Sequence, residues 1–279
     1  MRKIKYPLII SDFDGTLVRE DGCIDEKTKK AIDEYVKNGG VFAISTGRMP
    51  MGILSRAREL GLQGAVSSFQ GAVIMDIQTE QVLLQGRMEH ELAVRISTKM
   101  EELGLHIHTY DLIDYYSNCN NETEEFYVRC VGRRCVLQPQ MTAFIKQSGL
   151  KPYKLIALTN PAQADRVFNE LQTAFGNECL VTTSGAGEYV FVEVCNKLYS
   201  KGTAAEFLAK HYGVPLESTV GIGDQRNDLP MIRAVGVGVA VGNAHPALKQ
   251  EAQITLTQTN EQSAVGVFIE EYAYKESKQ

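Results

Sequence analysis

The sequence carries no excess of positive charge and no long apolar run. Its net charge is −5, so it lacks the positive field that binds nucleic acids and anionic membranes. No apolar run approaches the roughly 20 residues of a membrane span, and the basic residues 1–5 are followed too soon by Asp12 for a signal peptide. The sequence therefore predicts a cytoplasmic protein that binds neither nucleic acid nor membrane.

The six cysteines form no Cys-x-x-Cys pair, and the chain has no internal repeat or low-complexity segment. Scattered cysteines predict reduced thiols in a cytoplasmic protein, and no His/Cys spacing resembles a zinc site. The chain has 279 residues, of which 44% are hydrophobic and 23% are charged. This length and composition are typical of a globular protein with one large domain or two ordinary ones.

A short apolar run at residues 8–10 ends at two carboxylates, Asp12 and Asp14. The run is typical of a strand buried on both faces. Aspartates at the end of such a strand are costly to bury unless a cation meets them, and in open α/β sheets ligands bind beyond the carboxyl ends of the strands. The alternative for this stretch alone is an ordinary strand that leads into an Asp-Gly turn.

Two further apolar runs, at residues 41–44 and 219–222, also end in polar residues. The residues that follow are Thr46, Gly47 and Arg48 after the first run and Asp224, Asn227 and Asp228 after the second. Helical patterns alternate with these strands, which predicts an α/β fold with a Rossmann-like, doubly wound parallel sheet. Because parallel strands end at one edge of the sheet, we expect the three polar clusters to share one crevice.

The pattern of apolar and polar residues changes between residues 86 and 190. Helical and strand-like segments there surround a polar, acidic and tyrosine-rich passage at residues 111–134. After residue 190 the first pattern returns. We therefore predict a catalytic core formed by residues 1–85 and 191–279, with an α+β cap domain of residues 86–190 inserted into it.

The residue types at the three strand ends suit phosphoryl transfer, which depends on positioning and on neutralising charge. Mg²⁺ prefers oxygen ligands, and Asp12 and Asp224 can supply two, with the backbone carbonyl of Asp14 as a candidate third. One carboxylate can attack phosphorus, and a second can act as general acid and base. Each motif alone has a plainer interpretation: Thr46 in a turn, Lys201 on a solvated surface and Asp224 as a helix cap.

The string Asp12-Phe13-Asp14-Gly15-Thr16-Leu17 resembles the first motif of the haloacid dehalogenase (HAD) superfamily, whose members mostly move phosphoryl groups. The three other motifs of that superfamily can be matched in order at Thr46, Lys201 and Asp224. The resemblance implies an aspartyl-phosphate intermediate and Mg²⁺ as cofactor. It implies that Asp12 is the nucleophile and Asp14 the general acid and base. The phosphate-binding groups that it implies are Thr46, Arg48, Lys201 and Asn227, with the backbone of Phe13 and Gly47. The residues that it implies hold the metal are Asp12, Asp14, Asp224 and Asp228.

The place of the insert narrows the resemblance. The chain from Asp14 to Thr46 is too short for a cap domain, whereas the insert lies between Thr46 and Lys201. This arrangement is similar to the Cof-type subgroup (class IIB, with a C2-type cap), whose members mostly hydrolyse sugar phosphates, nucleotides or cofactor phosphates. Gln70 and Gly71 stand where that subgroup usually has Asn-Gly, so the family role is not carried over to Gln70.

A cap that closes over the crevice would exclude water and contact the leaving group. The candidates for this contact are His106, His108, Tyr110, Tyr115 and Tyr116. His106 and His108 alternate along a strand, and for them we expect the plainer alternative, which is the solvent-exposed face of that strand.

A basic cluster in the insert also has two interpretations. The cluster can meet a second phosphate of the substrate, but we expect it to balance nearby acidic residues on a solvated surface. The basic residues are Arg129, Arg133 and Arg134, and the acidic ones are Glu122, Glu124 and Glu125.

These observations predict a Mg²⁺-dependent phosphatase that acts on a small phosphorylated metabolite as a monomer or homodimer. A phosphomutase on the same scaffold is the rival enzyme, because the same residues would serve it. A phosphometabolite-binding protein without turnover is the rival of another class. The intact pair Asp12 and Asp14 speaks against it, since a binding protein needs no general acid. The lack of membrane spans excludes a transport ATPase.

Overall fold

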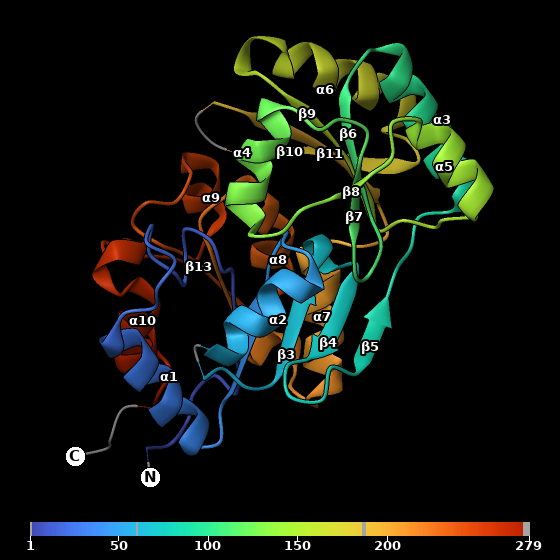
Figure 1. Ribbon diagram of the computed structural model, residues 1–279. Coiled ribbons are helices and arrows are strands. Elements are labelled where there is room, and N and C mark those ends of the chain that lie inside the picture. Colours follow the sequence, from blue (N-terminus) through green and yellow to red (C-terminus); the bar gives the residue numbers. More distant parts are fainter. Residues whose placement is uncertain (1, 60, 186–187, 276–279) are drawn as a thin grey trace. The chain divides into compact units, whose positions relative to one another are not determined.

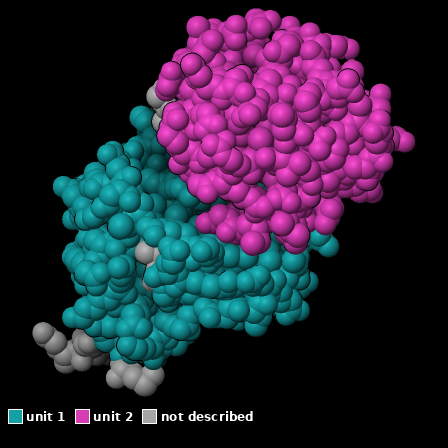
Figure 2. Space-filling view, in the orientation of Figure 1, with its two compact units in different colours: residues 1–48, 53–85, 199–279 teal, residues 49–52, 86–198 magenta. Residues whose placement is uncertain are grey.

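The chain forms two compact units (Figures 1 and 2), seen in a computed structural model that describes residues 2–59, 61–185 and 188–275. No helix in these described ranges is long and apolar enough to cross a membrane. The six cysteines all lie in the described ranges, and no disulfide is formed among them there. The first unit contains residues 1–48, 53–85 and 199–279, and the second contains residues 49–52 and 86–198.

An eight-stranded sheet forms the centre of the first unit. Its strands are β1 (Leu8–Ser11), β2 (Val41–Ser45), β3 (Ala65–Ser68), β4 (Val73–Asp76), β5 (Val82–Gln85), β12 (Thr219–Gly223), β13 (Val237–Ala240) and β14 (Ile254–Thr255). Their order is β14-β13-β12-β1-β2-β3-β4-β5. The strands from β14 to β3 are parallel, and β4 and β5 add an antiparallel hairpin at one edge. This arrangement confirms the predicted α/β class with a parallel core.

Helices cover both faces of this sheet (Figure 1). They are α1 (Glu26–Lys37), α2 (Pro50–Glu59), α7 (Lys201–His211), α8 (Leu229–Ala234), α9 (Pro246–Glu251) and α10 (Ala264–Tyr272). Leu8, Ile10 and Ala43 pack against the alanine-rich side of α7 and against α8. Phe42 alternates with Ala43 along β2 and faces α1, which packs on α10. Because both faces are covered, β1 is apolar throughout and Ile9 is as fully buried as its neighbours.

The second unit is built on a six-stranded sheet in the order β10-β11-β9-β6-β7-β8. Its pairs are antiparallel except for the parallel pair β7–β8. Its strands are β6 (His106–Tyr110), β7 (Tyr115–Ser117), β8 (Val136–Leu137), β9 (Lys154–Thr159), β10 (Cys179–Ser184) and β11 (Val190–Asn196). Its helices are α3 (His90–Glu102), α4 (Glu122–Val131), α5 (Met141–Ser148) and α6 (Pro161–Phe175).

The second unit extends past residue 190, where the sequence analysis places the end of the insert. β11 pairs with β10 on one side and with β9 on the other. The residues of β11 after 190 therefore complete the second sheet, and the unit continues to Leu198.

The two faces of the second sheet differ in polarity. One face packs against α3, α5 and α6 through apolar side chains such as Ile107, Leu155 and Val192. His106 and His108 alternate with Ile107, so they lie on the other face. Their exposed fractions are 9% and 0%. The expectation that they form a solvent-exposed face is wrong, because α4 covers that face.

Glu124 lies in the first turn of α4 and is buried among hydrogen-bond partners. His108 Nε2 is 2.7 Å from Glu124 Oε2, and the Tyr115 hydroxyl donates to Oε1 at 2.9 Å. Burial lowers the pKa of His108 to about 4, so its ring is neutral at neutral pH. Burial alone would raise the pKa of Glu124, but hydrogen bonds from His106, His108 and Tyr115 outweigh it and hold that pKa well below its usual value.

Arg129 and Arg134 of the insert contact residues other than Glu124. Arg134 pairs with Glu125 at 2.8 Å on the exposed surface, as expected. The guanidinium carbon of Arg129 lies 5.9 Å from the centre of the Phe126 ring. The expectation that the basic cluster also balances Glu124 is wrong, because the Glu124 carboxylate points into the polar interior beneath α4.

Candidate active site

The three predicted polar clusters lie at the ends of neighbouring strands. β1 pairs in parallel with β12 on one side and with β2 on the other, so Asp12, Thr46 and Asp224 follow adjacent strands. The Asp12 N–H donates to the carbonyl of Ile222 at 2.8 Å, which holds the residue after β1 against the end of β12. The fold thus brings residues that are far apart in sequence to one edge of the sheet.

A buried ammonium group bridges two carboxylates at this edge. Lys201 Nζ lies 2.6 Å from Asp12 Oδ1 and 2.5 Å from Asp228 Oδ1. Carboxylate oxygens of Asp12, Asp224 and Asp228 all lie within 4.8 Å of one another, and we call these three residues the acidic cluster. Lys201 and the acidic cluster are all buried. The side chains of Lys201 and Asp228 are 0% exposed, that of Asp12 is 7% exposed, and Asp224 is 3% exposed.

Charge at the acidic cluster is only partly compensated by Lys201, since three carboxylates and one ammonium leave two negative charges. Burial, followed by the neighbouring Asp228 carboxylate, raises the pKa of Asp12 well above its usual value. The same two causes raise the pKa of Asp224. Burial alone would lower the pKa of Lys201, but Asp12 and Asp228 outweigh it and raise that pKa. A divalent cation would remove this excess charge, and the oxygen donors of the cluster fit Mg²⁺.

Lys201 reaches the cluster from the first position of α7. Ser200 caps this helix: its hydroxyl accepts from the Thr203 N–H at 3.2 Å, while the Thr203 hydroxyl accepts from the Ser200 N–H at 2.9 Å. A lysine at a helix N-terminus is unfavourable for the helix dipole. The contacts with the buried carboxylates explain its presence there.

Thr16 and Gln225, for which the sequence analysis predicts no role, hold Asp224 in place. Thr16 Oγ1 donates to Asp224 Oδ1 at 2.9 Å, and Gln225 Nε2 donates to Oδ2 at 3.0 Å. The backbone N–H groups of Asp224 and Gln225 donate to Asp228 Oδ2 at 3.0 and 2.9 Å. Both residues stand inside the matched motifs, so adjacency to Asp12 and Asp224 is the signal that could have found them.

Asp14 pairs with Arg48 instead of joining the acidic cluster. Arg48 Nε lies 2.8 Å from Asp14 Oδ2, and Nη2 lies 2.7 Å from Oδ1. The Arg48 N–H also donates to Thr46 Oγ1 at 3.2 Å, and its guanidinium carbon lies 5.5 Å from the Phe13 ring centre. Since the Asp14 carboxylate is engaged in this way, a metal contact from Asp14 would have to use the backbone carbonyl.

Gln70 occupies the left-handed backbone region just after β3. Its φ is 59° and its ψ is 26°, and Phe69 before it has a φ of 49°, which is uncommon for residues other than glycine. Asn227 Nδ2 donates to Gln70 Oε1 at 3.1 Å. A Cβ on Gly47 would lie 2.6 Å from Gln70 Nε2, so glycine leaves room for this amide. Uncommon backbone conformations of this kind cluster at functional sites.

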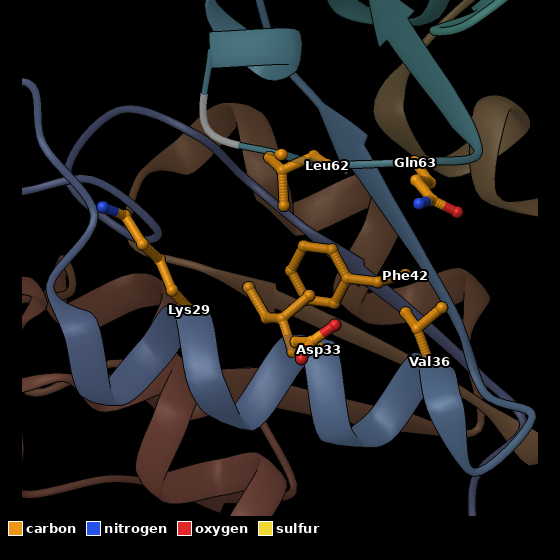
Figure 3. A pocket seen from close by; sticks show the side chains of 8 residues that line it. Lys29, Asp33, Val36, Phe42, Leu62 and Gln63 are labelled. Atoms are coloured by element: carbon orange, nitrogen blue, oxygen red, sulfur yellow. The ribbon is translucent and has the colours of Figure 1, made fainter.

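A cavity of about 240 Å³ in the first unit lies elsewhere (Figure 3). It is lined by α1, β2 and the chain after α2, and Phe42 and Val36 point into the space between α1 and Leu62. None of its lining residues belongs to the three polar clusters. We therefore assign no part of the chemistry to it.

Comparison with known families agrees with this geometry. The family described as haloacid dehalogenase-like hydrolase matches residues 9–269, which is nearly the whole chain. The chain belongs to this family. The resemblance drawn from the four motifs and from the position of the insert is therefore confirmed, and the HAD fold accounts for the parallel core of the first unit.

Relatives of this HAD hydrolase are named as phosphatases. 5-Amino-6-(5-phospho-D-ribitylamino)uracil phosphatase YitU of Bacillus subtilis is 25% identical over 271 residues, which cover 95% of this chain and 97% of the relative. Phosphatase YwpJ of the same species is 28% identical over 295 residues, which cover 92% of this chain and 96% of the relative. The HAD hydrolase is therefore a phosphatase and not a binding protein without turnover.

Solved structures show the same fold. The crystal structure of TM0651 from Thermotoga maritima matches with a TM-score of 0.83 and 25% identity, covering 97% of this chain and 98% of that one. The HAD subclass IIB sugar phosphatase BT4131 matches with a TM-score of 0.78 and 19% identity, covering 95% and 98%. At 19% identity, the second match shows similarity of fold only.

Proposed function

We propose that this phosphatase hydrolyses a small phosphorylated metabolite through an aspartyl-phosphate intermediate on Asp12. The observation that carries the proposal is the contact of 2.6 Å between Lys201 Nζ and Asp12 Oδ1. A carboxylate and a phosphate repel each other, and a fixed ammonium beside the carboxylate reduces that repulsion as they approach. The two other aspartates beside Asp12 provide a place for a cation that would reduce it further.

The reaction has two steps. First, a carboxylate oxygen of Asp12 attacks phosphorus, the bond from phosphorus to the leaving oxygen breaks, and protonated Asp14 gives its proton to that oxygen. Then Asp14 takes a proton from water, the water oxygen attacks phosphorus, and the bond to Asp12 breaks. Inorganic phosphate leaves and both aspartates return to their starting states. Acid–base assistance of this kind accelerates a reaction roughly 10²- to 10⁴-fold.

The acidic cluster would hold Mg²⁺. Asp12 and Asp224 supply carboxylate oxygens, Asp14 supplies its backbone carbonyl, and Asp228 supports the site from beside Asp224. When bound, the ion supplies positive charge that stabilises the phosphoryl oxygens in the transition state. The three oxygens that lie within 4.8 Å of one another support this assignment.

The phosphoryl group would be bound by residues around the same strand ends. Lys201 and Arg48 offer positive charge, and the Asn227 amide lies within reach of the Gln70 amide at 3.1 Å. The complete proposed set is Thr46, Arg48, Lys201 and Asn227, with the backbone N–H groups of Phe13 and Gly47.

The first unit serves as the catalytic core, and the second serves as the substrate-specificity cap. Substrate classes to test are sugar phosphates, nucleotides and cofactor phosphates, and the name of the relative YitU favours a phosphorylated ribityl compound among them. We also propose that the enzyme acts in the cytoplasm as a monomer or homodimer, and the scattered spacing of its six cysteines supports that location.

The test is release of inorganic phosphate from a panel of these compounds, with Mg²⁺ or with EDTA. The wild type is expected to release phosphate only with Mg²⁺. Asp12→Asn is expected to abolish release without changing the circular dichroism spectrum. Asp33→Asn makes the same change on the exposed side of α1 and is the matched control. Near-normal turnover by Asp12→Asn would contradict the mechanism.

A further inference from the structure

The second unit holds three converging metal-ligand atoms that the proposed phosphatase reaction does not use. They are Nε2 of His106, Nε2 of His108 and Oε2 of Glu124. We propose that these three residues form a binding site for a divalent transition-metal ion, with Zn²⁺ as the first candidate. By coordinating residues of both elements, the ion would link α4 to β6 within the second unit.

The distances among the three atoms come close to those of a tetrahedral site. The two Nε2 atoms are 3.2 Å apart, and the distances from Glu124 Oε2 are 3.3 Å to His106 and 2.7 Å to His108. Ligand atoms about 2.0–2.2 Å from a tetrahedral Zn²⁺ lie roughly 3.3–3.6 Å from each other. Two of the three separations therefore need almost no change, and the third has to open by roughly half an ångström.

The direction of the ring nitrogens also fits a metal. Two imidazole Nε2 atoms face each other and share one carboxylate oxygen, yet a proton on either nitrogen can serve only one neighbour at a time. A metal ion interacts with all three lone pairs at once. Coordination through Nε2 requires the proton on Nδ1. His108 Nδ1 has an acceptor for it in the Tyr110 hydroxyl at 3.3 Å, whereas His106 Nδ1 is buried without a hydrogen-bond partner among the described residues.

A shell of hydroxyl groups surrounds the three residues. The Tyr115 hydroxyl donates to Glu124 Oε1 at 2.9 Å, so Oε2 is left for the ion. Ser117 Oγ lies 2.8 Å from His106 Nε2, which is a proposed ligand atom, so the ion would have to replace this contact. The Tyr110 hydroxyl lies 2.6 Å from the hydroxyl of Tyr127 in α4. Second contacts of this kind orient ligands in metal sites.

Charge at this place favours a cation. Glu124 is 1% exposed, and within the described ranges it forms no ion pair with a lysine or arginine. The nearby Lys154 forms its own buried pair with Glu193 at 2.8 Å. Hydrogen bonds already stabilise this buried carboxylate, and a cation would add a charge of opposite sign beside it. Two imidazoles and one carboxylate are donors that suit Zn²⁺, whereas Mg²⁺ prefers oxygen ligands alone.

The sequence did not indicate this site because its spacing is not local. His106 and His108 share a face of β6 only because strand side chains alternate. Glu124 comes from α4, and its N-cap Asn121 sets where that helix begins: the Asn121 side chain accepts from the Glu124 N–H. The third ligand is thus placed by helix capping and packing.

The experiment is a calorimetric titration of Zn²⁺ into the full-length protein after treatment with a chelator, in excess Mg²⁺ to fill the acidic cluster. One tight Zn²⁺ per chain is expected for the wild type and for Asp12→Asn, which removes a ligand from the acidic cluster only. Glu124→Gln and His106→Gln are expected to weaken binding roughly 100-fold or more. His106 is the least buried of the three ligands, so its variant keeps the test valid if Glu124→Gln fails to fold.

His90→Gln is the matched control, because it makes the same change in the same unit at α3, where Nδ1 lies 3.0 Å from the Leu150 carbonyl. It is expected to bind Zn²⁺ as the wild type does. Substitution with Co²⁺ gives a second measurement, since visible absorption of a four-coordinate ion should appear in the wild type and vanish in His106→Gln. The proposal is overturned if the wild type binds no tight Zn²⁺, if Asp12→Asn removes all Zn²⁺ binding, or if both ligand variants bind as tightly as the wild type.

Discussion

Arg48 binds both carboxylate oxygens of Asp14, through Nε at 2.8 Å and Nη2 at 2.7 Å. While both oxygens are engaged, neither is available to carry the proton that a general acid donates. A phosphate group offers the guanidinium another bidentate partner. Binding of the substrate phosphate would therefore draw Arg48 away from Asp14 and release Asp14 for the reaction.

Arg48→Lys tests this exchange of partners. A lysine keeps the charge but cannot contact two oxygens in a planar fork, so we expect kcat/KM to fall roughly tenfold, which corresponds to about 1.4 kcal/mol. Steady-state kinetics on the best substrate measure the change. Arg233→Lys makes the same substitution at the exposed pair with Glu251 and should leave kcat/KM unchanged. An unchanged value for Arg48→Lys would show that the bidentate contact of Arg48 has no part in the reaction.

Lys201→Met tests the compensation of charge at the acidic cluster. Removing the ammonium leaves buried carboxylates without their partner, and such losses cost about 3–5 kcal/mol of unfolding free energy. The loss should be largest in EDTA and smaller with saturating Mg²⁺, because the ion replaces part of the missing charge. Urea unfolding under both conditions measures it. Lys210→Met, on the exposed side of the same helix, is the control, and an equal loss with and without Mg²⁺ would contradict the electrostatic explanation.

The strand ends of the first unit could be predicted because their signal is local. The apolar residues of β1 and β12 run directly into Asp12 and Asp224, and parallel pairing then places the two ends side by side. Lys201 could be singled out because a lysine at a helix N-terminus is unfavourable unless something else compensates. Each of these inferences uses neighbours in sequence and one general rule of sheet topology.

The residues that could not be predicted depend on contacts between distant segments. Alternation along β6 puts His106 and His108 on one face, but only the packing of α4 decides whether that face meets water. Gln70 is a poor choice for a left-handed conformation, and no sequence pattern indicates one there. Its role becomes visible only through Asn227, which comes from the far end of the chain.

Gln70→Asn tests whether the longer amide matters. Asparagine adopts the left-handed region more readily, so the unfolding free energy should be unchanged or higher by up to about 1 kcal/mol. The shorter side chain should lose its contact with Asn227 and raise KM. Chemical unfolding and steady-state kinetics separate the two effects. Gln63→Asn, at an exposed position, is the control, and a stable variant with an unchanged KM would show that Gln70 does not shape the site.

The raised pKa of Asp12 predicts how stability depends on pH when Mg²⁺ is absent. In the unfolded chain Asp12 loses its proton near its usual pKa of 3.8, whereas burial and then Asp228 keep it protonated to higher pH in the folded protein. Between these two values the folded state binds more protons than the unfolded state. The free energy of unfolding must therefore fall as pH rises through this window, and Asp224 contributes in the same direction.

Urea unfolding in EDTA from about pH 4 upward to neutral pH, for the wild type and Asp12→Asn, measures this contribution. Other groups also titrate in this range, so the difference between the two proteins is the relevant quantity. The advantage of Asp12→Asn over the wild type should grow with pH in EDTA and shrink with Mg²⁺, because the ion stabilises the ionised carboxylate that the variant lacks. Parallel curves in EDTA would mean that Asp12 is already ionised in the folded protein at low pH, and that Lys201 alone offsets the cost of burying it.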